Sequence, residues 1–313
     1  MYATTVDIHR KAVAAIVLVA AIGCQDRETP KPVKDLVPNP DTTKTQLQCE
    51  WNESFAGFVE LQEASGAVYV AGDDPFLLVV GDSGTNGQFV ELDPETGSVL
   101  ARGNLPLDSG ASDDIEGLSM FGKTFYGVTS GGWVREWDRI GQGKYVLVHG
   151  AYPIAQQGLQ PPLLCKTSRM TNCAQNYEGL CLQSVRDDKC VGYIASKQAG
   201  KLYCLMFRKE HGSDRRLLSV DPANTISVSG KNTLTGCHFS ADGKSVWAGT
   251  NFFGFHRVYQ ISFGQGGSVL SIEPRGSMGR GFQEALAIGP NRSIYRFSDV
   301  GSSPSLIDRY DCR

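Results

Sequence analysis

Three glutamates hold equivalent places in a sequence pattern that recurs along the chain. The pattern is a polar or acidic residue, a Gly and an apolar pair, followed after a turn by an aromatic-rich strand with a polar end. Glu116, Glu178 and Glu284 occupy the acidic position in three copies, and Asp114 lies beside the first. If the copies are structural repeats, these carboxylates converge and repel one another at low effective dielectric. Ca²⁺, which tolerates irregular sets of oxygen ligands, is the simplest neutralising ion.

The sequence leaves a second interpretation of these glutamates open. Each carboxylate would then accept hydrogen bonds from backbone N–H groups of a neighbouring repeat, or pair with an arginine such as Arg296, without a metal ion. Residue types and spacing alone do not decide between these two interpretations.

A second set of polar residues ends the strands that follow the acidic motif. Its members are Asp82, Ser130, Lys197, Asn251 and Asp299. Equivalent strand ends in stacked repeats lie at one edge, so we expect these residues and Arg296 to face the same mouth and bind a small-molecule or protein ligand. Lys197 and Arg296 would bind a carboxylate or phosphate group. The alternative is that they are ordinary solvated turn residues.

The spacing of the motif indicates the architecture. The acidic position falls at residues 65, 116, 178, 235 and 284, where Ser65 and Thr235 stand in place of Glu. Each unit contains about four short strands of alternating polarity separated by turns, which is typical of a propeller blade. The sequence therefore predicts an all-β fold, a β-propeller with five four-stranded antiparallel blades. Six blades are possible but need one more unit than the sequence shows.

Closure of the ring is predicted from the two ends of the repeat region. The last unit, from about Gly281, is too short for four strands, and residues 45–51 alternate like a strand. We expect this N-terminal strand to complete the last blade, with a disulfide between Cys49 and Cys312 that locks the ring. A local bridge for Cys49 is the alternative.

The first 44 residues are predicted to lie outside this domain, which spans residues 45–313. Arg10 and Lys11 precede an apolar run that is too short to span a bilayer and is typical of a secretory signal. Its end resembles the lipobox of bacterial lipoproteins, which implies a signal peptide over residues 1–23 and an acylated Cys24. The Pro-rich residues 24–44 then form a tether. Plain secretion is the alternative.

Composition and cysteine content fit an exported, globular protein. Eight cysteines besides Cys24 form an even set without the spacing of a zinc finger, which favours structural disulfides. The net charge of −3 gives no basic field for nucleic acid, and membrane contact is expected through the lipid anchor only. Gln25 follows Cys24, which by analogy with bacterial lipoproteins implies the outer membrane of the cell envelope.

Two motif copies resemble a known family. The Asp-x-Glu-Gly-Leu start at Asp114 and the Tyr-Glu-Gly-Leu start at Tyr177 resemble the SdiA-regulated and esterase-like phytase group of calcium-associated propellers. The resemblance covers roughly residues 58–313. A fainter similarity links the chain to gluconolactonase and paraoxonase propellers, in which a Glu-Gly strand start supplies a calcium ligand. This likeness implies a calcium-binding role for Glu116, Glu178 and, by position, Glu284.

Two functions from different classes follow. The first is a membrane-tethered propeller of the bacterial cell envelope that binds a ligand or partner at its mouth, with calcium at the axis. The second is a calcium-dependent hydrolase of phosphoesters, esters or lactones, in which the ion polarises the scissile group. A phytase-like site should hold many Lys and Arg residues beside its acids, and few are present near the strand ends. The sequence therefore favours binding.

Overall fold

The computed structural model describes residues 49–313 except 56, 155–164, 184–189, 231–232, 253–254, 278–281 and 300–303. The predicted signal peptide (1–23), lipidation site Cys24 and tether (24–44) lie outside the described residues. Within the described ranges, no helix is long and apolar enough to cross a membrane.

Twenty-one strands in these ranges form five antiparallel sheets. Blade 1 contains β3 (Ala64–Val70), β4 (Phe76–Gly81), β5 (Gln88–Leu92) and β6 (Val99–Asn104). Blade 2 contains β7 (Ile115–Phe121), β8 (Thr124–Thr129), β9 (Trp133–Gly141) and β10 (Lys144–Pro153). Blade 3 contains β11 (Tyr177–Leu182), β12 (Gly192–Ser196), β13 (Lys201–Lys209) and β14 (Arg216–Ser227). Blade 4 contains β15 (Leu234–Phe239), β16 (Ser245–Phe252), β17 (Phe255–Phe263) and β18 (Val269–Ser277).

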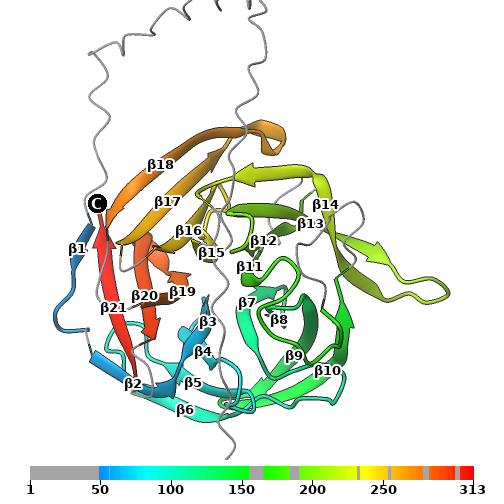
Figure 1. Ribbon diagram of the computed structural model, residues 1–313. Helices are drawn as coiled ribbons and strands as arrows, with labels where there is room; N and C mark the ends of the chain where they lie inside the picture. The colour runs from blue at the N-terminus through cyan, green and yellow to red at the C-terminus, as the bar shows by residue number, and fades with distance from the viewer. Residues whose placement is uncertain are drawn as a thin grey trace, which may run out of the picture. The chain divides into compact units, whose positions relative to one another are not determined.

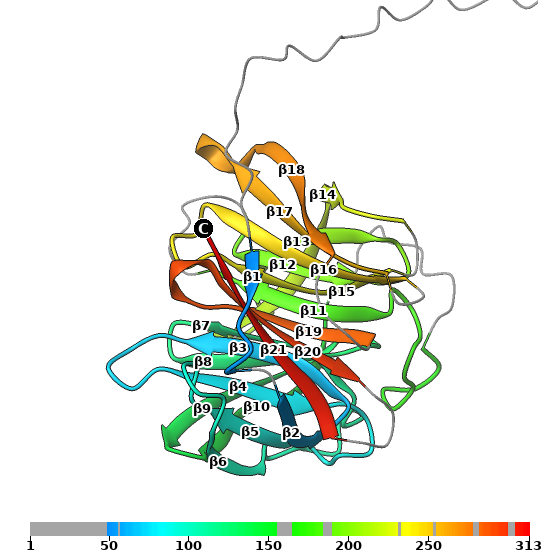
Figure 2. The ribbon, with the colours of Figure 1, turned by 90° about the vertical axis from the view of Figure 1, so that its left-hand side faces the viewer.

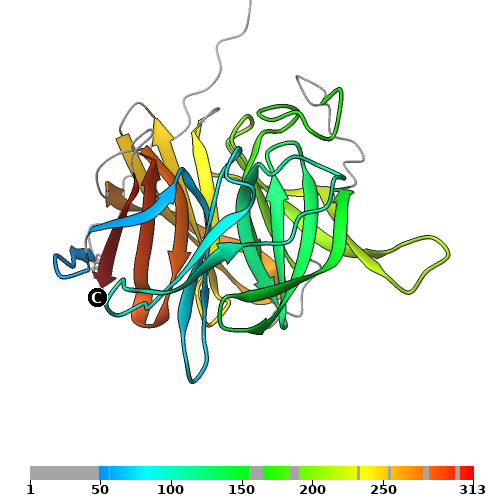
Figure 3. The same cartoon turned by 90° about the horizontal axis from the view of Figure 1, so that it is seen from below.

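Blade 5 draws on both ends of the described chain. It contains β19 (Phe282–Ile288), β20 (Ser293–Asp299), β21 (Pro304–Cys312), β1 (Cys49–Trp51) and β2 (Gly57–Gln62). The innermost strands β3, β7, β11, β15 and β19 surround a common axis, seen end-on in Figure 1, and the connecting turns lie on two opposite faces (Figure 3). The predicted five-bladed propeller with four-stranded antiparallel blades is confirmed.

Alternating residues of each blade pack against opposite neighbours. Val79 of β4 belongs to the core between blades 5 and 1, whereas Leu78 and Val80 belong to the core between blades 1 and 2. Three similar cores lie between the other adjacent blades. Because both faces of an inner strand are covered, β4 and β11 are buried throughout, while the outermost β6 is largely exposed. Because alternate side chains of each strand face opposite sides of the sheet, each blade contributes to a core with both of its neighbours in the ring.

The N-terminal strands close the ring as predicted. Both β1 and β2 pair antiparallel with β21 (Figure 2). Cys49 lies opposite Cys312 and forms a disulfide with it. Of the strand predicted over 45–51, residues 49–51 form β1, and residues 45–48 lie outside the described part. Most of the fourth strand is β2, whose alternating burial places Val59 and Leu61 in the core.

Removing the closing disulfide should cost much of the fold's stability. The bridge joins residues 263 positions apart, and the chain-entropy model gives about 5 kcal/mol for so long a loop. We expect Cys49→Ser with Cys312→Ser to lower the free energy of unfolding by roughly that amount in chemical denaturation. Removing Cys165–Cys173, which spans only 8 positions, should cost about half as much. Equal losses from both pairs would contradict ring closure by this bridge.

The remaining disulfides lie on one side of the ring. Cys181 of β11 and Cys237 of β15 join the innermost strands of blades 3 and 4. Cys190 and Cys204 form a bridge within blade 3, and Cys165–Cys173 closes a loop before it. Disulfides are typical of oxidising compartments, so these bridges indicate an extracytoplasmic protein.

Candidate metal and ligand site

In each innermost strand, the pairing register with the next strand is interrupted once, at the acidic position of the sequence repeat. One extra residue interrupts the pairing of each inner strand with its neighbour. These residues are Ser65, Glu116, Glu178, Thr235 and Glu284. A β-bulge re-aims the side chain at its position. All five blades contribute to one small axial cavity, which the three glutamates and Ser65 line directly.

Glycines beside the bulges allow the inner strands to approach closely. A Cβ atom on Gly117 would lie 2.5 Å from the backbone N of Leu180, and one on Gly179 would lie 2.7 Å from Cα of Gly236. The axial cavity is only about 10 Å³, which accommodates about one water molecule. The Glu-Gly motif therefore combines a carboxylate aimed at the axis with a residue small enough for the narrow ring.

Three carboxylates meet at one end of the axis. The ligand oxygens of Asp82, Asp114 and Glu116, here called the acid cluster, all lie within 4.8 Å of one another. Asp82 directly follows β4, whereas Asp114 and Glu116 belong to the start of blade 2. The cluster thus spans two adjacent blades.

Hydrogen bonds hold the members of the acid cluster in place. Ser65 Oγ donates to Glu116 Oε2 at 2.5 Å, and Ser130 donates to Asp114 Oδ2 from its Oγ at 2.5 Å and its backbone N at 3.1 Å. Asp113 Oδ2 accepts backbone N–H bonds from residues 84 and 86, which ties the loop after Asp82 to the start of β7. This last contact brings Asp82 beside Asp114.

The environment of the acid cluster disfavours its negative charge. Burial raises the pKa of Glu116 well above its usual range, and the charges of Glu178, Asp82 and Asp114 raise it further. Burial also raises the pKa of Asp82 to about 7, with a contribution from Asp114, to which Asp82 is hydrogen-bonded. Without a cation, the cluster therefore retains protons near neutral pH.

The raised pKa values predict how stability depends on pH in the absence of divalent ions. A carboxyl group whose pKa is higher in the folded than in the unfolded state binds more protons when folded, so the free energy of unfolding falls as pH rises. For Asp82 this loss runs from its usual value near 3.8 up to about 7. We expect Tm in a chelator to fall across this window, and Asp82→Asn to flatten the decline. An unchanged slope in that variant would contradict the assignment.

Glu178 lies on the same axis but has a cationic partner. Lys197 Nζ lies 3.0 Å from Glu178 Oε2, and Asn176 Nδ2 donates to Glu178 Oε1 at 2.9 Å. Burial alone would lower the pKa of Lys197, but Glu178 and Glu284 reverse that effect and raise it. The site thus contains an acid cluster beside a half-buried lysine.

The structure rearranges the predicted set of metal ligands. Of Glu116, Glu178, Glu284 and Asp114, only Asp114 and Glu116 have oxygens in the close group, which Asp82 completes. All three glutamates do line the axis. The sequence predicts Asp82 in the ligand-binding set at the strand ends instead, because it carries no signal that Asp113 draws the loop after Asp82 inward.

The other predicted ligand-binding residues separate. Ser130 is buried and bonded to Asp114, and Lys197 is paired with Glu178. Arg296 is fully buried within blade 5, where its Nη1 lies 3.2 Å from Asp308 Oδ2 on the next strand. Asn251 lies in β16 and its backbone N donates to Thr233 O at 2.7 Å, and the side chain of Asp299 lies outside the described part.

A strained loop lies against the acid cluster. Asn172, Ala174 and Asn176 all have positive φ, between 46° and 54°, a region that residues other than Gly rarely adopt. The backbone N of Asn172 donates to Ser130 Oγ at 2.8 Å, and Cys165–Cys173 fastens the segment. Backbone strain of this kind persists where surrounding contacts enforce it, and it is enriched at functional sites.

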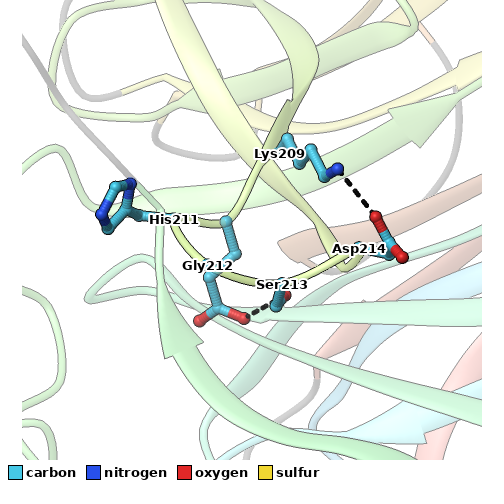
Figure 4. A pocket seen from close by; sticks show the side chains of 6 residues that line it. Lys209, His211, Gly212, Ser213 and Asp214 are labelled. Atoms are coloured by element: carbon cyan, nitrogen blue, oxygen red, sulfur yellow. Dashed lines mark hydrogen bonds and ion pairs between the residues drawn. The ribbon is translucent and has the colours of Figure 1, made fainter.

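A pocket at the projecting β13–β14 hairpin is less suited to binding. The pocket has a volume of about 450 Å³ and is lined by residues 209–214 of this one turn. Lys209 Nζ pairs with Asp214 Oδ1 at 2.7 Å and Ser213 Oγ donates to Glu210 Oε2 at 3.1 Å, while His211 points away (Figure 4). These polar groups therefore serve each other within one exposed turn.

The class of fold is thus a five-bladed β-propeller with acids gathered at its axis. No protein-family profile matches the chain, and no curated protein sequence matches it. Its similarities to solved structures are distant. They include the PQQ-bound aldose sugar dehydrogenase of Streptomyces coelicolor (12% identity, 85% of this chain and 98% of that one, TM-score 0.46). The glutaminyl cyclase of Myxococcus xanthus has 14% identity over 82% and 97% of the chains (TM-score 0.42). A luciferin-regenerating enzyme has 11% identity over 85% and 95% (TM-score 0.47).

Proposed function

We propose that this protein is an extracytoplasmic, calcium-binding propeller that recognises a ligand or partner at the mouth formed by the acid cluster. The observation that carries the proposal is the mutual distance of at most 4.8 Å among the oxygens of Asp82, Asp114 and Glu116. Calcium binds oxygens at 2.3–2.6 Å, so two ligands of one calcium ion lie at most about 5.2 Å apart, and the three oxygens of the acid cluster meet this limit.

A buried hydroxyl at the bulge position of another blade also supports bound water or an ion at the axis. Thr235 holds the bulge position of blade 4, is fully buried, and its Oγ1 has no hydrogen-bond partner in the described part of the chain. A buried hydroxyl without a partner is costly. An ion with its hydration water at the axis would supply one, since calcium takes six to eight oxygen ligands, including water.

Lys197 is the residue from which we infer that the mouth prefers an anionic ligand. Its ammonium group lies beside the acid cluster and carries a charge that Glu178 balances. A ligand with a carboxylate or phosphate group would contact the bound ion and Lys197 together, because both favour anionic oxygens.

This preference is tested by calorimetric titration of the calcium-loaded protein with phenyl phosphate and with benzoate. We expect Lys197→Gln to weaken binding about tenfold, the effect of losing roughly 1.4 kcal/mol. Lys209→Gln, at the exposed β13–β14 turn, serves as the control and should bind normally. Binding that is unaffected by Lys197→Gln, or a Lys197-dependent component of binding that persists in chelator, would contradict the proposal.

A hydrolase is the second candidate, and the grouping of the oxygens of Asp82, Asp114 and Glu116 within 4.8 Å favours it. These carboxylates would hold the ion, so none of them is assigned as the proton-transfer group. Bound calcium would supply Lewis acidity at this position. A screen against phytate, aryl phosphates, lactones and short aryl esters, with and without calcium, tests this candidate. Activity that survives Asp82→Asn and Glu116→Gln would exclude the acid cluster as its centre.

The location of the protein is part of the proposal. The four disulfides support an extracytoplasmic site. We extend this to an outer-membrane lipoprotein anchored at Cys24, on the basis of the sequence around that residue. Metabolic labelling with a fatty acid should mark the protein, and Cys24→Ser should abolish the label and release the protein from membranes. Label retained in Cys24→Ser would contradict the anchor.

A further inference from the structure

A second pocket lies between blades 4 and 5, at the ends of the inner strands opposite the acid cluster. The acid cluster includes residues that begin β7, whereas this pocket is formed by the turns that follow β15 and β19. Its volume is about 310 Å³, at the lower end of the range for small-molecule sites. The two sites therefore lie on different faces of the ring.

The rim of this pocket is cationic. Lys244, in the β15–β16 turn of blade 4, and Arg292, in the β19–β20 turn of blade 5, line it from the two adjacent blades. Asp242 is the acidic residue of the lining, and its Oδ1 already accepts bonds from Ser240 Oγ at 2.7 Å and from the backbone N of Lys244 at 3.0 Å. Two cations against one occupied carboxylate leave a positive charge at the entrance.

The interior of the pocket offers fixed polar groups beside an apolar wall. Arg275 Nε donates to Gln260 Oε1 at 3.0 Å, and Gln260 Nε2 donates to Ser245 Oγ at 3.2 Å, so the amide is held in one orientation. Phe263 and Ile288 supply apolar surface from the two blades. An ordered polar wall facing an apolar one is typical of a small-molecule site.

Trp247 provides the observation that points to a ligand. It lines the pocket and is fully buried, yet its Nε1 has no hydrogen-bond partner in the described ranges. The indole N–H of Trp137, by contrast, donates to Pro106 O at 2.8 Å. Leaving a buried N–H without an acceptor destabilises the folded state. An acceptor group in the pocket would offset this destabilisation.

The backbone at the rim is also unusual. Asn291 and Arg292 both have positive φ, 55° and 62°, in the turn that presents Arg292 to the pocket. Gly or Asn normally fills such positions because a longer side chain is strained there. The chain thus places a guanidinium group where local conformation favours Gly.

We propose that this pocket binds a small organic anion. Its carboxylate or phosphate lies between Lys244 and Arg292, its body packs against Phe263 and Ile288, and an acceptor atom satisfies Trp247 Nε1. The site is independent of calcium and of the acid cluster.

The experiment follows the indole N–H signals of ¹⁵N-labelled protein in chelator, so that the acid cluster holds no ion. The probes are benzoate and glucose 6-phosphate, with benzamide and glucose as uncharged controls, each at millimolar concentration. Trp247→Phe identifies the signal of Trp247. We expect at least one anion to shift it saturably, and the uncharged control of that anion to leave it in place. Failure of both anions, or equal shifts with the uncharged analogues, would overturn the proposal.

Variants at the rim test the same site without disturbing the core. Arg292→Gln and Lys244→Gln should each weaken binding of the responding anion about tenfold. Lys123→Gln is the matched control, because Lys123 is an exposed cation in the β7–β8 turn on the same face. Unchanged affinity in both rim variants would overturn the proposal. Should Trp247→Phe fail to fold, calorimetric titration of the wild type against Arg292→Gln decides alone.

Discussion

Replacing Glu116 by Gln will have opposite effects on Tm with and without calcium. In chelator at neutral pH, folding binds a proton at Glu116 because burial raises its pKa well above the usual range, and the variant does not carry this cost, so Tm should rise. With calcium, the same substitution removes an ion ligand. An ion at a hundred times its dissociation constant stabilises by about 2.7 kcal/mol, which is roughly 5–10 °C in Tm for a domain of this size. The variant should lose that gain, as measured by thermal unfolding under both conditions.

The control for this prediction is a buried glutamate outside the acid cluster. Glu136 of β9 is also buried with a raised pKa, and Tyr152 Oη donates to it at 2.8 Å. Glu136→Gln should therefore change Tm by the same amount with and without calcium. A calcium response that Glu116→Gln retains, or that Glu136→Gln also loses, would argue against an ion at the acid cluster.

A single methyl group at the axis should be strongly destabilising in one blade and harmless in another. The Cβ atom of Gly117→Ala would lie 2.5 Å from the backbone N of Leu180, where no flexible side chain can yield. Overpacking of this kind costs about 1–3 kcal/mol, and contact with backbone places this variant at the upper end. At the equivalent Gly236, the nearest atom to an added Cβ is 3.8 Å away. Gly236→Ala should therefore be neutral or stabilise by up to about 1 kcal/mol.

Denaturant unfolding of the two alanine variants checks this difference. Because both glycines follow a bulge in an innermost strand, the comparison removes effects of helix or strand propensity. Similar losses of unfolding free energy in both variants would contradict the close approach of β7 and β11 at the axis.

Most of the fold could be predicted from the sequence repeat, because the periodicity of a propeller is visible in the local sequence of each unit. Each unit shows its acidic motif and its strands within about fifty residues, so the five bulge positions could be placed from sequence. The closing bridge followed from the same count, since the last unit lacked a strand. The strand β2 was missed although Phe58–Leu61 alternates, because a weak pattern beside an apparent N-terminal strand gives no reason to prefer it.

Which residues make up the site was harder to predict from the sequence, because the site depends on contacts between loops that are distant in the chain. Asp82 joins the acid cluster through the backbone bonds that Asp113 accepts, and no local pattern encodes that pairing. Likewise, no local pattern predicts the ion pair between Lys197 and Glu178, which gives this one of the three glutamates a cationic partner. Ser65 and Thr235, which break the acidic motif, turn out to be polar groups at the same level of the axis.

The position of the ion is the most direct test of the proposed function. A crystal of the protein grown with calcium should show an anomalous scattering peak among Asp82, Asp114 and Glu116, with carboxylate oxygens at about 2.3–2.6 Å. Density without such a peak, with the three carboxyl groups still bonded to Ser65, Ser130 and one another, would contradict the calcium site.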